Sequence, residues 1–301
     1  MKKGTIILFF YLIHLNAVAQ IGFAGHNDIL KFKDQTLYVV LDGDSAYTKL
    51  MEDCLRRYWK FNKYQFISQS EIVNIEKYKQ KWYLMNWLEL SETSSIGDDL
   101  DHYFIGIVRP GSSWNLEKGT MVNSYKAVYF PFNFATDWTY LLPNIIQVFQ
   151  NYLDFASENS HLSRFSLETL SSGGFLKSTS DNYRKGVKDL KSRELWIQFR
   201  DFPGHYKNMF YKKLDFSFDD FKKAYGDSVK LVSADDIKAA ILRQDDNVVY
   251  AYRTSATFML IEAKGGRVIY LTHSGRSRTE LAFRDEGFNK HHLDLLMQEL
   301  K

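Results

Sequence analysis

The chain has 301 residues, of which 45% are hydrophobic and 25% are charged, a composition typical of a globular protein with room for two modest cores. Disordered, collagen-like and coiled-coil classes are excluded by this balance. The 39 basic and 36 acidic residues give a formal charge of +3, which provides no electrostatic reason to expect a nucleic-acid partner. The single cysteine, Cys54, excludes an intrachain disulfide and a multi-cysteine metal site.

The first 19 residues have the pattern of a cleaved secretory signal peptide. Lys2 and Lys3 form a basic start, 5–15 is an apolar run, and Ala17 and Ala19 are small residues suited to a signal peptidase. The apolar run is too short for a membrane-spanning helix, which needs about 20 residues. We therefore expect cleavage after Ala19, a mature chain of charge +1 without a transmembrane segment, and a periplasmic or secreted location.

The remaining chain contains the same order of predicted elements twice. In the first half, strands are predicted at 37–41, 64–68, 103–108 and 127–132, and helices at 46–59, from 71 onward, and at 139–155. In the second half, strands are predicted at 195–199, 229–233, 258–262 and 267–271, and helices at 218–224, after 233, and at 288–300. This repetition predicts a tandem duplication of one β-α-β-α-β-β-α module.

The domain organisation follows from the repeat. Residues 1–19 are the expected signal peptide, 20–156 the first α/β module, and 191–301 the second α/β module. Between the modules, 157–190 loses its periodicity and is rich in serine, which is typical of a linker.

Each module is predicted to belong to the α/β class. Its mixed sheet should have the strand order 2-1-3-4, with strands one to three parallel, strand four antiparallel, and helices on both faces. This arrangement resembles the small α/β modules of TolB-type and CsgG-type periplasmic proteins, and residues 63–68 followed by Glu71 and Ile72 are similar to theirs. Residues 58–67 also resemble a stretch in uncharacterised secreted proteins of Gram-negative bacteria. These resemblances cover short motifs and imply the fold only.

A ligand-binding crevice is expected in the first module, where the strand order reverses between strands one and three. Asp42, Asp44 and Ser45 follow the first strand, and Arg109 follows the predicted third strand and leads into a loop that contains Trp114. These five residues are the candidate ligand-binding set. The alternative for Asp44 or Ser45 is to cap the next helix, and the alternative for Trp114 is to pack its own loop.

The pair Asp42 and Asp44 resembles the aspartates of haloacid-dehalogenase-type phosphatases, in which such a pair binds Mg²⁺ or divides the nucleophile and acid roles. The expected layout opposes this reading, because the acidic stretch 98–101 precedes the predicted third strand and should lie at the opposite edge of the sheet. The threonine of that family is also missing, since Ala46 occupies its position.

Known catalytic motifs do not occur in the sequence. It has no Gly-x-Ser-x-Gly, Walker, Gly-x-Gly-x-x-Gly, His-Glu-x-x-His or Cys-x-x-Cys pattern. We therefore expect no catalytic residue, no metal and no cofactor, and predict a binding or scaffolding protein whose partner is an envelope protein or a small ligand. The alternative is a small-molecule hydrolase or phosphatase-like enzyme that uses the crevice of the first module.

Overall fold

A computed structural model describes residues 25–41, 43–72, 81–89, 102–109, 125–132, 138–159, 187–198, 218–253, 257–273 and 297. The first half contains α2 (His26–Lys33), β1 (Leu37–Leu41), α3 (Ser45–Tyr58), β2 (Tyr64–Ser68), α4 (Gln69–Ile72), β3 (Trp82–Glu89), β4 (His102–Arg109), β5 (Tyr125–Phe132), η2 (Thr139–Leu141) and α6 (Leu142–Glu158). The second half contains η3 (Val187–Ser192), β6 (Glu194–Gln198), α9 (Phe218–Tyr225), β7 (Val229–Val232), α10 (Ala234–Arg243), β8 (Val248–Arg253), β9 (Thr257–Glu262) and β10 (Val268–His273).

The strands form two five-stranded mixed sheets with the same plan. Their orders are β2-β1-β3-β4-β5 and β7-β6-β8-β9-β10. In each sheet the first strand is parallel to the second and third, whereas the fourth is antiparallel to both the third and the fifth. The predicted α/β class and the duplicated mixed sheet are confirmed, but each sheet has a fifth strand, which lies between the predicted first and third strands.

A β-bulge that both sheets share supports the duplication. In the first sheet one extra residue of β5, Ala127, lies between the partners of Ile107 and Val108. In the second sheet one extra residue of β10, Ile269, lies at the same place in the ladder between the fourth and fifth strands. Because a β-bulge bends its strand in a specific way, the same bulge in both copies is a structural signature of one repeated unit.

The strands that sequence reasoning missed are β3 and β8, the third strand of each sheet. Their residues are nearly continuously apolar, because a central strand covered on both faces does not alternate between polar and apolar side chains. The predicted third and fourth strands, 103–108 and 127–132, are therefore the fourth and fifth strands of the sheet. The direction assigned to 103–108 was wrong, since β4 runs antiparallel to its neighbour β3, which is parallel to β1.

Local sequence signals explain how the helices begin. The hydroxyl of Ser233 accepts a hydrogen bond from the backbone N–H of Asp236, and the carboxylate of Asp236 accepts from the N–H of Ser233, which together form a capping box on α10. At the equivalent start of α4, Glu71 accepts from the N–H of Ser68 at 2.7 Å. Helix α6 has a proline, Pro143, in its first turn, where a missing N–H costs nothing.

Three helices, α2, α6 and η3, differ from the prediction at the ends of the modules. Helix α2 was not expected. Helix α6 continues to Glu158 and η3 begins at Val187, so helical structure extends into both ends of the stretch 157–190. The expected signal peptide and most of the expected helix at 288–300 lie outside the described residues.

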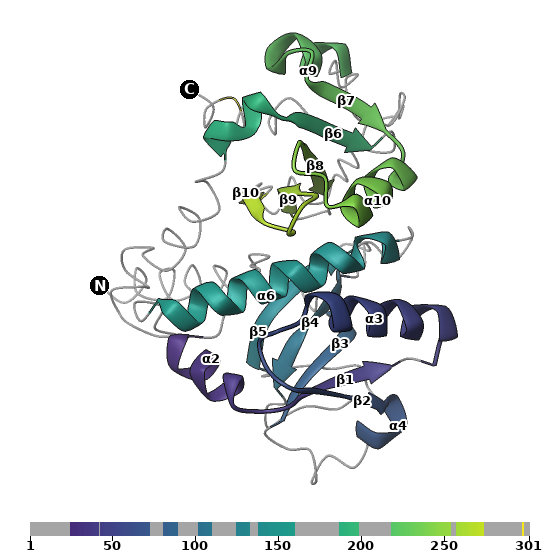
Figure 1. Cartoon of the computed structure of the whole chain (residues 1–301), viewed down its shortest axis with the longest axis vertical. Coiled ribbons are helices and arrows are strands. Elements are labelled where there is room, and N and C mark those ends of the chain that lie inside the picture. Colours follow the sequence, from purple (N-terminus) through teal and green to yellow (C-terminus); the bar gives the residue numbers. More distant parts are fainter. Residues whose placement is uncertain are drawn as a thin grey trace, which may run out of the picture.

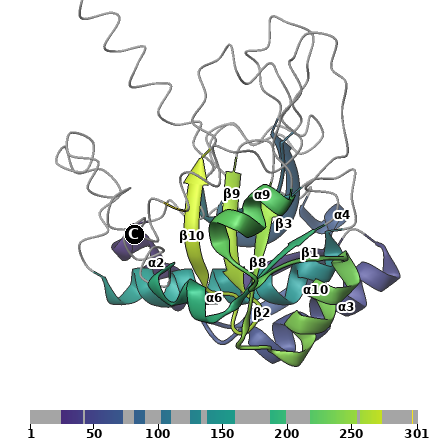
Figure 2. The same cartoon turned by 90° about the horizontal axis from the view of Figure 1, so that it is seen from above.

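One hydrophobic core crosses from the first sheet to the second. Figure 1 shows helix α6 between the two sheets, with α2 and α3 packed beside it, and in the view from above in Figure 2 the second module overlies the first. Eleven of its 17 residues are buried, which is the pattern of a helix covered on all sides rather than along one stripe. The same core cluster contains Val39 of β1, Phe149 of α6 and Tyr250 of β8.

The two modules pack through different faces. Leu37 and Leu195 hold equivalent register positions, opposite the first residues of β2 and β7, yet Leu37 belongs to the shared core and Leu195 to a separate cluster beneath α9. The face of the first sheet that carries α3 and α6 therefore meets the face of the second sheet that carries α10. This is a head-to-tail arrangement rather than a two-fold symmetric one.

Candidate functional site

At the predicted crevice, Asp44 has a structural role. Its carboxylate Oδ1 accepts from the backbone N–H groups of Ala46 at 2.7 Å and Tyr47 at 3.0 Å, so Asp44 is the N-cap of α3. Ser45 is the exposed first residue of that helix. Asp42 and Trp114 lie outside the described residues.

Arg109 does not join this group. It is the last residue of β4, and because β4 runs antiparallel to β3, its backbone lies at the edge where β1 and β3 begin. Its guanidinium lies 5.2 Å from the ring centre of Trp82, the first residue of β3. The length of β1, roughly 15 Å, separates this edge from Asp44. The expectation that Arg109 and Asp44 line one crevice was therefore wrong.

The acidic stretch 98–101 lies outside the described residues. The expectation that it belongs to the edge opposite Asp44 assumed that the strand after it runs parallel to β1. That assumption was wrong, because β4 runs antiparallel to β3 and its first residue, His102, pairs with Glu89, the last residue of β3.

Aromatic side chains fill the described part of the predicted crevice. The hydroxyl of Tyr47 donates to the amide oxygen of Asn86 on β3 at 3.4 Å. Trp138, only 8% exposed, meets the Tyr47 ring edge-on at 6.1 Å and stacks on Phe132 at 4.2 Å between ring centres. This place is therefore a packed aromatic cluster in the described structure.

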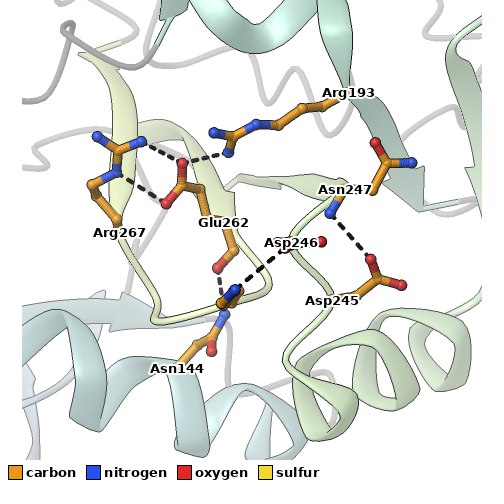
Figure 3. Close-up of polar contacts among 8 residues, drawn as sticks. Asn144, Arg193, Asp245, Asp246, Asn247, Glu262 and Arg267 are labelled. Atoms are coloured by element: carbon orange, nitrogen blue, oxygen red, sulfur yellow. Dashed lines mark hydrogen bonds and ion pairs between the residues drawn. The ribbon is translucent and has the colours of Figure 1, made fainter.

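A buried polar network joins the two modules along α6. The amide nitrogen of Asn144 donates to the backbone carbonyl of Glu262 at 2.9 Å and to the hydroxyl of Tyr250 at 3.2 Å (Figure 3 shows the former). Near the start of α6, the amide of Gln198 donates to the hydroxyl of Tyr140. Because Asn144 is 1% exposed and Gln198 3% exposed, these bonds satisfy groups that water cannot reach.

The side chain of Glu262 is held between two arginines, as Figure 3 shows. Arg267 contacts both carboxylate oxygens, at 2.9 Å and 2.5 Å, and Arg193 contacts one of them at 2.5 Å. Burial alone would raise the pKa of Glu262, but the hydrogen bonds and positive charges of Arg267 and Arg193 outweigh it and lower that pKa below its ordinary value. The carboxylate thus stays ionised at neutral pH.

A polar groove of about 440 Å³ lies beside this joint. It is bounded by the ends of α2 and α3, by the segment that follows α3, by α6, and by Gly265 in the turn between β9 and β10. Both modules therefore contribute to it. Its side chains include the cations Lys33, Arg57 and Lys60, and a single carboxylate, Asp154.

Hydrogen bonds fix the polar wall of the groove. The side-chain oxygen of Gln150 accepts from the backbone N–H of Lys60 at 2.8 Å, and its nitrogen donates to Asp154 at 2.8 Å. Asn151 donates to the carbonyl of Gly265 at 2.7 Å, which ties α6 to the second module. Sequence reasoning missed this groove because its residues come from segments that lie far apart in the chain, and the basic run at 56–63 is the only local signal.

No described residues form a metal site or a membrane span. Within the described ranges, no group of three or more histidine, cysteine, aspartate or glutamate side chains is arranged to bind a metal ion. Among the same residues, no helix has the length and apolar character needed to cross a bilayer. Cys54 is buried on α3, where desolvation raises the pKa of its thiol to about 12.

Comparisons of the chain with protein-family models, with curated proteins and with solved structures found no match.

Proposed function

We propose that the protein is a periplasmic or secreted binding or scaffolding protein that acts without catalysis. The observation that carries this proposal is the groove at the joint of the two modules, where three cations face a single carboxylate. Two points support it further: the capping role of Asp44 is structural, and Arg109 lies at the other edge of the sheet. A groove built from two rigidly joined modules suits the holding of a ligand or a partner.

Localisation is tested first. The full chain with a C-terminal tag is expressed in a Gram-negative host, the cells are fractionated, and the purified protein is analysed by mass spectrometry. We expect a periplasmic or secreted product that begins at Gln20. An uncleaved chain retained in the cytoplasm would contradict the proposed location.

Binding is tested with the purified mature protein exposed to an envelope extract. Bound components are released by denaturation and identified, and the Arg57→Gln, Lys60→Gln double variant is treated in the same way. We expect a component that the wild type retains and the double variant loses. Equal capture by both proteins would remove the groove from the proposal.

A phosphatase-like enzyme remains a second candidate for one specific reason. The geometric objection to it assumed that the strand after 98–101 runs parallel to β1, and β4 instead runs antiparallel to β3, so this objection no longer holds. The purified protein is incubated with phosphate monoesters and Mg²⁺, beside an Asp42→Asn, Asp44→Asn double variant. Hydrolysis by the wild type that the variant lacks would replace the binding proposal with the enzymatic one.

A further inference from the structure

We infer that the groove at the module joint binds a small anion that carries two or more carboxylate or phosphate groups. This inference rests on the proposed binding function and specifies its ligand. Its basis is the unbalanced charge of the groove, the fixed amide groups beside that charge, and the contribution of both modules to one site.

Among the described residues, the cations of the groove outnumber its carboxylates. In the described part of the chain, none of the cations Lys33, Arg57 and Lys60 forms an ion pair with a carboxylate. Lys33 lies 5.9 Å from the ring centre of Phe61, which orients its ammonium group without neutralising it. The single carboxylate of the groove, Asp154, accepts from Gln150. The groove therefore has an excess of positive charge in a protein whose total charge is almost balanced.

The amide groups add directed hydrogen bonding. The side-chain nitrogens of Gln150 and Asn151 each donate one hydrogen bond to the protein, to Asp154 and to the carbonyl of Gly265 respectively. A primary amide nitrogen has two N–H groups, so each residue keeps a second donor in a fixed orientation. Donors held by the protein beside cations are the chemistry that recognises acid groups, because each ionised oxygen accepts several hydrogen bonds. The volume of about 440 Å³ matches a small molecule rather than a peptide surface.

The C-terminal ends of two helices explain the presence of some basic residues of the groove, but not of all of them. Helices α2 and α3 both end beside the groove, and basic residues in a last turn offset the partial negative charge of the C-terminal carbonyls. Arg56 serves the same helix end as Arg57, yet it does not line the groove and pairs with Asp53 at 3.4 Å. Lys60 lies beyond the end of α3, so the helix gives no reason for its charge.

This difference between neighbouring cations supplies matched variants. The groove variant is Arg57→Gln with Lys60→Gln. The control variant is Arg56→Gln with Lys63→Gln, which removes the same charge from the same segment but from residues outside the groove. Both variants are first compared with the wild type by circular dichroism and thermal unfolding, so that a loss of binding is not confused with a loss of folding.

Binding is measured by isothermal titration calorimetry with three probes: citrate, inorganic triphosphate and neutral sucrose. We expect at least one of the two anions to bind the wild type, sucrose not to bind, and the groove variant to bind the anion about tenfold more weakly or worse, while the control variant stays within about twofold. Binding by citrate only assigns the site to carboxylates, and binding by triphosphate only assigns it to phosphates.

Two results would overturn the inference. If neither anion binds, the ligand is not a small polyanion, and a component captured from the envelope extract would still support the wider binding function. If the groove and control variants lose affinity equally, the attraction comes from general surface charge and the groove is not the site.

Discussion

Single residues decide how the loop after β1 is interpreted. A carboxylate after a strand is suited both to bind a ligand and to cap the next helix, and the local sequence is the same in both cases. Asp44 accepts two hydrogen bonds from the first turn of α3 at one carboxylate oxygen, Oδ1, so that oxygen is already used by the backbone. The structure thereby favours the capping alternative for Asp44.

Substitution of Asp44 separates the two roles. Asp44→Ala removes the cap and should lower the free energy of unfolding by about 1 kcal/mol, whereas Asp44→Asn keeps an acceptor oxygen and should change it by only a few tenths of that amount. Urea denaturation followed by circular dichroism measures both values. An Asp44→Ala variant as stable as the wild type would show that the cap contributes nothing.

The thiol of Cys54 should be unreactive in the folded protein. Burial raises its pKa to about 12, with a smaller contribution from Asp53, so the reactive thiolate is scarce even at mildly alkaline pH. We expect no modification by a thiol reagent in the native state and complete modification in concentrated guanidinium chloride, both monitored by mass spectrometry. Rapid native modification would mean that the helix α3 opens readily.

At the scale of elements, helix α6 has a role that its pattern only partly indicates. Ile145, Val148, Phe149 and Tyr152 form the apolar stripe expected of a closing helix. The buried amides beside this stripe, Asn144 and Gln147, are explained only by the second module, to which Asn144 donates hydrogen bonds. The spacing of apolar residues along a helix indicates how much of its surface is apolar, but it does not indicate which element covers that surface.

The turn between β9 and β10 should tolerate a side chain at one glycine and not at the next. Both Gly265 and Gly266 have positive φ, at +74° and +62°, so alanine at either costs about 1 kcal/mol. At Gly266 an added Cβ would also lie 2.7 Å from the carbonyl oxygen of Asn144 on α6. Gly266→Ala should therefore be less stable than Gly265→Ala by about 2 kcal/mol.

Urea denaturation of the two alanine variants measures this difference. Gly265→Ala is the control, since nothing lies within 4 Å of its added Cβ and only the backbone conformation is penalised. Equal stabilities would mean that the turn does not approach α6 as closely as described.

The carboxylate of Glu262 should make stability depend on pH. Its pKa is lower in the folded state than in the unfolded state, so its contribution is present above the unfolded value of about 4.3 and is lost as the pH falls through the lower folded-state pKa. Glu262→Gln should lower the free energy of unfolding by about 2 kcal/mol at neutral pH, and the difference from the wild type should shrink in acid.

A second glutamate on the same sheet provides the control. Glu194 also has a lowered pKa, chiefly through its hydrogen bond from Lys230, but Lys230 is half exposed and solvent weakens the pair. Glu194→Gln should change the stability by less than about 0.5 kcal/mol. Equal effects of the two substitutions across a pH series of denaturation curves would contradict the special role of Glu262 at the joint.

At the scale of the whole molecule, the two modules share one hydrophobic core. Their shared core includes residues of both sheets and of α6, and different faces of the repeated unit meet at the joint. The duplication therefore does not imply two independent domains. A module separated from its neighbour would expose either the buried side of α6 or the face that carries α10.

We expect a single cooperative unfolding transition of the mature chain. Because the core is continuous across the joint, opening one module exposes apolar surface of the other, which couples their stabilities. Differential scanning calorimetry should give equal calorimetric and van't Hoff enthalpies. Two resolved transitions would show that the modules unfold separately.

Local patterns predicted several strands and helix starts. Strands 37–41 and 229–233 were predicted because each is a short β-branched run beside turn or cap residues, and the cap at Ser233 because a serine precedes an acidic first turn. Strands β3 and β8 are covered on both faces and do not alternate, and they were missed. That omission reversed the direction of β4 and placed Arg109 at the wrong edge.

The sequence by itself determined the α/β class, the duplication and the capped helices, because these depend on the spacing of side chains within a segment. Only the tertiary structure decided which edge each strand end occupies, which face of one module meets the other, and which cations line the groove. Those properties depend on contacts between residues far apart in the chain, as between Asn151 of α6 and Gly265 of the last hairpin. A single sequence without aligned relatives contains no pattern that pairs such residues.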